Sequence, residues 1–104
     1  MITILENKLD EIIKTCREMQ VQSLYLFGSA TRKNDFTAKS DLDFLFRFNI
    51  GKDGLPLSKY DYFDLLFRLE EITNKKVDLV AEEKISNKYF LERVNKEKIK
   101  IYES

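Results

Sequence analysis

Two short motifs combine residue types that could hold a triphosphate and its metal ions. The first is the pair Gly28 and Ser29 at the end of an apolar segment, and the second, after an eleven-residue spacer, is the pair Asp41 and Asp43. Glycine lets the backbone approach a phosphate because it has no Cβ, and serine adds a hydroxyl beside its N–H. Carboxylates suit Mg²⁺ or Mn²⁺, with water and phosphate oxygens completing the shell. The pattern indicates metal-dependent phosphate chemistry.

The two acids share one face of a strand predicted over residues 41–48. The apolar residues that alternate with them are Leu42, Phe44, Phe46 and Phe48. Like charges on one face repel, so the pair lowers stability unless a cation or solvent offsets the repulsion. Two divalent ions about 3.5–4 Å apart would stabilise both the attacking and the leaving oxygens of a transfer reaction. Taken alone, the pair would be better explained as exposed acids at a strand start.

A third acid shifts that balance towards function. Residues 76–80 are predicted to form another strand, with Val77 and Leu79 on one face and Asp78 on the other. If this strand lies beside the first, about 4.8 Å away, Asp78 could bind metal or accept the proton of an incoming nucleophile. The alternative is a surface acid that follows two lysines.

The segment after the Gly-Ser pair could add positive charge. A short helix over residues 29–34 would point free N–H groups and the positive end of its dipole at a phosphate, and Arg32 and Lys33 would lie beside them. A Gly-Ser pair by itself also fits an ordinary turn, so its significance lies in its position ahead of the acids.

Together these motifs resemble the nucleotidyltransferase superfamily that includes polymerase beta and the aminoglycoside nucleotidyltransferases, and most closely its minimal, MNT-type, single-domain branch. The matching stretches are Leu-Phe-Gly-Ser over residues 26–29, Ser-Asp-Leu-Asp-Phe over 40–44, Val-Asp-Leu-Val over 77–80 and Ile-Tyr-Glu over 101–103. They cover nearly the whole chain. One departure is the spacer, which in that family most often has about ten residues, with a glycine common where Lys33 stands here.

The resemblance implies roles for particular residues. Catalytic and metal-binding roles fall to Asp41, Asp43 and Asp78, and nucleotide-binding roles to Gly28, Ser29 and Arg32. The implied cofactors are two Mg²⁺ ions, with Mn²⁺ as an alternative, and the implied substrate is a nucleoside triphosphate, ATP above all.

The resemblance also implies a protein partner. Larger relatives carry extra domains that grip the base and the acceptor, so a partner is expected to complete the site of this short chain. Many minimal members are paired with a small helical HEPN protein as antitoxin and toxin, and some transfer AMP from ATP to a tyrosine of that toxin. This antitoxin activity is the function that the resemblance implies.

Hydrophobic periodicity predicts an α+β fold with a mixed sheet and helices mainly on one face, which leaves an open face for the site. The expected elements are a helix over 3–20, strands over 21–27, 41–48, 76–80 and 98–103, a loop over 49–57, a helix capped by Ser58 that ends near Asn74, and a helix over 86–94 that turns Tyr89 and Phe90 inward.

Composition is consistent with one small domain over residues 1–104, 43% of them apolar. The 18 basic and 18 acidic residues balance, which argues against a grip on long nucleic acid. The single cysteine, Cys16, is expected to fill the core of a protein in a reducing cytoplasm. No segment is typical of a membrane span or an export signal. Whether the chain forms a homo-oligomer is left open.

Two other functions fit parts of the pattern. One is a non-catalytic antitoxin, a binding module that neutralises a helical partner by contact and keeps the acids as a vestige or a metal-held scaffold. The other is a small-molecule nucleotidyltransferase that acts on an antibiotic, which is weaker because no substrate-binding domain follows the motifs.

Overall fold

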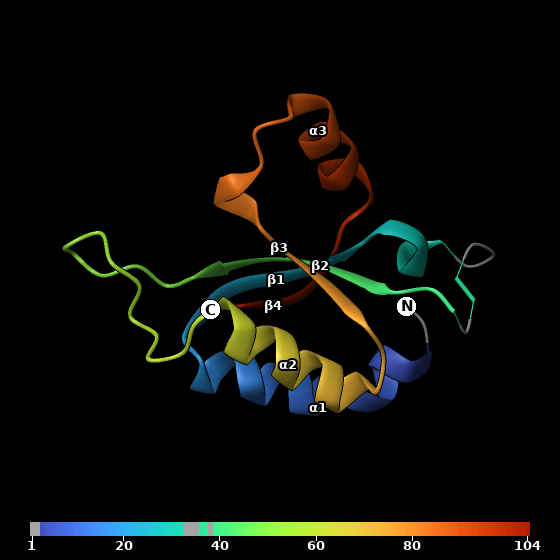
Figure 1. Cartoon of the computed structure of the whole chain (residues 1–104), viewed down its shortest axis with the longest axis horizontal. Helices are drawn as coiled ribbons and strands as arrows, with labels where there is room; N and C mark the ends of the chain where they lie inside the picture. The colour runs from blue at the N-terminus through green and yellow to red at the C-terminus, as the bar shows by residue number, and fades with distance from the viewer. Residues whose placement is uncertain (1–2, 33–35, 38) are drawn as a thin grey trace.

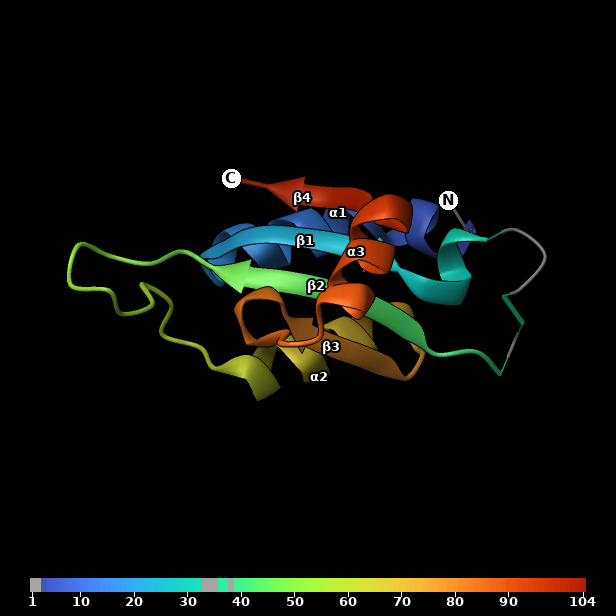
Figure 2. The same cartoon turned by 90° about the horizontal axis from the view of Figure 1, so that it is seen from above.

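The fold is built on a mixed sheet, as predicted. The computed structural model describes residues 3–32, 36–37 and 39–104. Within them the strands are β1 (Val21–Phe27), β2 (Leu42–Phe48), β3 (Val77–Ala81) and β4 (Ile99–Glu103), in the order β3-β2-β1-β4. β1 pairs antiparallel with β2 and with β4, whereas β3 runs parallel to β2. Figure 2 shows this order across the sheet, with β4 and β3 at the two edges.

The helices lie mainly on one face of the sheet, as expected. α1 (Thr3–Glu18) and α2 (Tyr62–Thr73) lie together beneath it in Figure 1, and α3 (Lys88–Glu97) lies on the opposite side. Two short 3-10 helices, η1 (Gly28–Thr31) and η2 (Glu82–Lys84), follow β1 and β3. The face expected to be open is therefore partly covered by α3.

The two faces carry cores of different size. The face covered by α1 and α2 has the main cluster of buried residues, which includes Ile12, Cys16 and Phe44, all completely inaccessible. The α3 face has a small cluster of Phe27, Leu45 and Val94. Since neighbouring residues of a strand point to opposite faces, Phe44 and Leu45 belong to different cores. Cys16 is a core residue, as predicted.

Local signals explain where α2 begins and ends. Asp61 caps it, because its carboxylate accepts a hydrogen bond from the Asp64 amide while Asp64 accepts one from the Asp61 amide. The prediction that Ser58 caps the helix is wrong, since the Ser58 hydroxyl accepts a bond from the Tyr60 amide in the preceding turn. Asn74 ends the helix in a left-handed conformation, as expected.

α3 differs from its prediction in length and in one side chain. It begins after Asn87, whose side chain caps it, and continues to Glu97 rather than ending near Val94. Phe90 is half-buried and packs edge-on against Phe27 at a ring-centroid distance of 6.0 Å. Tyr89 is 75% exposed, so the prediction that it points inward is wrong. Tyr89 and Phe90 are neighbours in the sequence, and neighbouring residues of a helix point in different directions, so only one of them can face the core.

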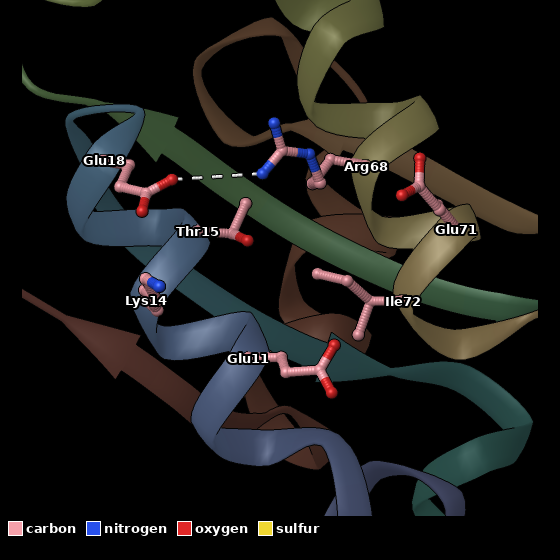
Figure 3. Close-up of a pocket in the computed structure, with 7 residues that line it drawn as sticks. All are labelled: Glu11, Lys14, Thr15, Glu18, Arg68, Glu71 and Ile72. Carbon is pink, nitrogen blue, oxygen red and sulfur yellow. Dashed lines mark ion pairs between the residues drawn. The ribbon is translucent and has the colours of Figure 1, made fainter.

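Other surfaces lie away from the predicted acids. A groove of about 350 Å³ between α1 and α2 holds mixed charges, and Figure 3 shows Arg68 reaching across it to Glu18, 3.9 Å away. Most of the exposed large apolar side chains lie between β2 and the middle of α2, and they are Ile50, Leu55, Leu57, Tyr60, Phe63 and Phe67. In the part of the chain that is described, no helix is both long and apolar enough to cross a bilayer.

Candidate active site

A cleft of about 360 Å³ opens where α3, η1 and the neighbouring ends of β2 and β3 meet. Five of the six residues predicted to form the site line it or lie in it: Gly28, Ser29, Arg32, Asp43 and Asp78. The sixth, Asp41, is exposed just ahead of β2. The lining also includes side chains of α3. The structure therefore gathers, at one end of the sheet, predicted residues that lie up to 50 positions apart in the sequence.

Pairing of β2 with β3 brings the acids together. Asp43 and Asp78 are direct partners in the parallel register, which is the arrangement that the alternation in both segments predicted. Asp43 is half-buried, whereas Asp78 is exposed. Burial and, after it, the negative charges of Asp78, Asp41 and Glu97 together raise the pKa of Asp43 to about 6, against the opposing charge of Arg32. Asp43 is therefore a half-buried carboxylate with three other acidic side chains near it.

The donor set fits a divalent cation, although it is not assembled into a closed cage. Among the described residues, no three His, Cys, Asp or Glu side chains are grouped so that they could hold a metal ion by themselves. The oxygens at this edge belong to carboxylates, and ions such as Mg²⁺ take one or two carboxylates, with water and substrate phosphate completing the shell. Asp41 and Asp43 are the residues that would hold such an ion, with Asp78 beside them. A cation would also offset the repulsion that, together with burial, raises the pKa of Asp43.

Gly28 is required by its surroundings. Its φ of +75° lies in the left-handed region, and a Cβ at this position would overlap Oδ2 of Asp43. The first motif and the second are thus in direct contact across the β1 and β2 pairing, where Phe27 is the partner of Asp43. The close approach of the Gly28 backbone, predicted for a phosphate, is made here to a carboxylate.

The short helix predicted over residues 29–34 is a 3-10 helix here, and it ends at Thr31 because the backbone of Arg32 is extended. The Thr31 hydroxyl donates to the Gly28 carbonyl at 2.7 Å, and the Arg32 amide donates to the Ser29 carbonyl at 3.0 Å. These bonds close the turn and direct Ser29 and Arg32 to the cleft. Lys33, the other predicted source of positive charge, lies outside the described residues, as does the end of the predicted helix over 29–34.

Glu97, a cleft residue that the sequence reasoning missed, contacts the predicted phosphate-binding groups. Oε1 of Glu97 accepts a hydrogen bond from the Gly28 amide at 3.0 Å, and Oε2 lies 2.6 Å from a guanidinium nitrogen of Arg32. The Glu97 side chain is 19% exposed. Glu97 could have been found from its spacing, because Phe90, Val94 and Glu97 recur at helical intervals on one face. Ending the predicted helix at Val94 left it out.

Arg93 and Phe90 complete the α3 wall of the cleft. Phe90 was predicted to point inward but was not assigned to a site, and Arg93 was not predicted at all. Arg93 lies four residues before Glu97, so both side chains project from the same side of the helix. The cleft thus has an acidic strand side and a mixed helix side.

Comparison with known proteins identifies the family of this chain. Residues 7–104 match the family model described as polymerase beta nucleotidyltransferase, and the chain belongs to that family. The class agrees with the resemblance seen in the motifs: the chain is a nucleotidyltransferase.

Two curated relatives come from Methanocaldococcus jannaschii, and both are named "Putative protein adenylyltransferase". One is 33% identical over 98 residues, which cover 89% of this chain and 94% of the relative. The other is 34% identical over 93 residues, which cover 89% of this chain and 87% of the relative.

Solved structures share the fold. One described as a minimal nucleotidyltransferase superposes with a TM-score of 0.71 at 27% identity and covers 91% of this chain and 90% of its own. Another, described as a tri-AMPylated Shewanella oneidensis HEPN toxin in complex with its MNT antitoxin, has a TM-score of 0.60 at 20% identity, with coverage of 95% and 72%. The predicted α+β nucleotidyltransferase fold is confirmed.

Proposed function

We propose that this chain uses Mg²⁺ to transfer AMP from ATP to a hydroxyl acceptor, and that the acceptor is a tyrosine of a HEPN-type toxin that the transfer inactivates in the cytoplasm. The observation that carries the proposal is the register that sets Asp43 directly beside Asp78 at the mouth of the Gly28 cleft. The adenylyltransferase names of the curated relatives support the nucleotide, and a toxin–antitoxin complex of the same fold supports the partner.

The residues of the cleft divide the work of the transfer. Mg²⁺ held by Asp41 and Asp43 would supply positive charge to the phosphate oxygens. Gly28 and Ser29 bind the β- and γ-phosphates, and the acceptor oxygen attacks the α-phosphorus. The bond from this phosphorus to the oxygen bridging to the β-phosphate breaks, pyrophosphate leaves, and Asp78 takes the proton of the acceptor hydroxyl. Positioning and charge neutralisation supply most of the catalysis in such a mechanism.

The surface offers room for a protein acceptor. Asp78 is exposed, so an acceptor can reach it from solvent. The exposed apolar residues between β2 and the middle of α2 include Phe63 and Phe67, which are 58% and 60% exposed. The ring centroids of these two residues lie 6.2 Å apart, and paired exposed aromatic side chains of this kind are typical of protein interaction sites. Both features support a protein rather than a small molecule as the acceptor.

The test is a labelling experiment. The purified chain is incubated with α-labelled ATP, Mg²⁺ and lysate of its host, and the Asp43→Asn variant is run beside it. We expect wild type to label a discrete band whose mass reports the acceptor, and Asp43→Asn to lose at least about a hundredfold of this activity because the metal-binding carboxylate is gone. Asp10→Asn, the same change on exposed α1, is the matched control and should label normally.

A non-catalytic antitoxin is the second candidate. The bonds from Gly28 and Arg32 to Glu97 favour it, because they occupy groups that a triphosphate would need. A folded Asp43→Asn protein that still neutralises the partner in cells, together with a wild-type protein that labels nothing with Mg²⁺ or Mn²⁺, would establish this candidate in place of the enzyme.

A further inference from the structure

The groups of the cleft best suited to bind an anion are already bound to one. Both oxygens of Glu97 are engaged, one by the Gly28 amide at 3.0 Å and the other by the Arg32 guanidinium at 2.6 Å. A backbone N–H beside a guanidinium is a common arrangement for phosphate as well as carboxylate oxygens. Glu97 reaches Gly28 from 69 positions away in the sequence, so only the tertiary fold brings the two together.

The contacts of Glu97 with Gly28 and Arg32 place a third carboxylate in the cleft, where it is repelled by the other acids. The Glu97 carboxylate adds a negative charge to the cleft that already holds Asp43 and Asp78, and it is among the charges that raise the pKa of Asp43. A carboxylate in such surroundings is favourable mainly through its bonds to Gly28 and Arg32. If Gly28 and Arg32 bound a phosphate instead, the Glu97 carboxylate could move away from Asp43 and Asp78, and its repulsion by them would fall.

We propose that Glu97 is an internal substitute for a nucleotide phosphate: its carboxylate holds Gly28 and Arg32 while the cleft is empty, and an incoming triphosphate must displace it. The inference rests on the proposed function, since it takes the same cleft to be the triphosphate site. Arg93 lies four residues earlier on the same face of α3 and also lines the cleft, so it is the cation that we expect the displaced carboxylate to contact. Glu97 thus sets the affinity of the cleft for phosphate.

The test measures binding of inorganic tripolyphosphate to the full chain without metal, so that metal coordination and the transfer chemistry do not enter and the repulsion from Asp43 and Asp78 is the same in every variant. Glu97→Gln keeps the size of the side chain but removes the competing charge, and we expect its Kd to fall by about tenfold relative to wild type. Arg32→Gln should bind at least about tenfold more weakly than wild type. The matched control is Glu92→Gln, an exposed position on the same helix, and it should bind as wild type does.

A second variant and a local probe guard against misfolding. Glu97→Asp keeps the charge but is one methylene too short to keep both bonds, so it should tighten binding by less than Glu97→Gln does. The amide resonance of Gly28 should shift on addition of tripolyphosphate and should already be shifted in Glu97→Gln, since that amide exchanges one acceptor for another. A purely structural role for Glu97 would leave the Kd unchanged in folded variants.

The outcomes separate this inference from the proposed function. An unchanged or higher Kd in Glu97→Gln, or the absence of tripolyphosphate binding in all variants, would overturn the role of Glu97 even if the chain labels an acceptor. Tighter binding by Glu97→Gln in a chain that labels nothing would support the substitute role and reject the transfer activity.

Discussion

The two faces of the sheet differ in polarity although the same strands form both. Towards α1 and α2, the side chains of β2 are apolar and buried, apart from Phe48, which is half-buried, and Phe44 is completely inaccessible. Towards α3, the same strand presents Asp43, Leu45 and Arg47, of which only Leu45 is buried. Burial of apolar surface stabilises the first face, and repulsion between carboxylates destabilises the second. The α1 and α2 face of the sheet therefore stabilises the fold, and the α3 face, with its carboxylates, partly offsets that stability.

The largest expected effect is on the stabilising face. Phe44→Ala should lower the free energy of unfolding by about 3–5 kcal/mol, because it leaves a cavity in the main core. Phe63→Ala, at a ring that is 58% exposed, should lower it by less than about 1 kcal/mol. Urea denaturation of both variants measures the difference. Equal losses would show that the main core is not the source of stability that the comparison requires.

A smaller effect is expected from pH on the charged face. The pKa of Asp43 is raised to about 6, and only the ionised carboxylate can hold a cation. We therefore expect the rate of transfer at limiting Mg²⁺ to level off above about pH 7 and to fall by about tenfold per pH unit well below pH 6. A pH series of the labelling reaction measures this. A rate that stays flat down to pH 4.5 would mean that Asp43 ionises normally.

The smallest expected effect is on the free energy of unfolding, which the ionised carboxylate of Asp43 lowers. Its pKa is higher in the folded chain than its ordinary value of 3.8, so its contribution favours folding at low pH and is lost as pH rises through about 6. Asp43→Asn should therefore raise the free energy of unfolding at pH 7 by about 1 kcal/mol, a value reduced from the full shift to allow for solvent screening. The gain should vanish below about pH 4.

Thermal unfolding of Asp43→Asn and the control Asp10→Asn at both pH values checks this sign. The control lies on the exposed side of α1 and should show no gain at either pH. If Asp43→Asn is instead less stable than wild type at pH 7, Asp43 is held by favourable bonds. The conclusion that its charge destabilises the α3 face would then be wrong.

Much of the fold and half of the site could be predicted from local signals. The bounds of β1 and the alternation through β2 follow from period-two hydrophobicity, which is why Asp43 and Asp78 were predicted on the polar face. The position of α3 could not be predicted in this way, because which face a helix covers depends on contacts between distant segments. Tyr89 was given the wrong direction for that reason, whereas Glu97 was missed because the predicted helix ended at Val94.

The roles of the predicted site residues are a separate matter from their placement. The cleft brings together Gly28, Arg32, Asp43 and Asp78 as the motifs indicated, and it leaves Asp41 exposed at its edge. Their functions as ligands or acids remain predictions that the labelling and binding experiments test. Sequence alone could not show that Arg32 would meet a carboxylate of its own chain, since that partner lies 65 positions away.

The contact between Gly28 and Asp43 has a consequence for how this sequence can vary. A methyl group at position 28 would meet the Asp43 carboxylate, and the positive φ disfavours every other L-amino acid there. A change at position 28 therefore strains the backbone of η1 and displaces the Asp43 carboxylate at the same time. A shorter residue at position 43 would relieve the collision but would remove the acid. Positions 28 and 43 are thus coupled, because a side chain at the first requires a smaller residue or a shifted carboxylate at the second.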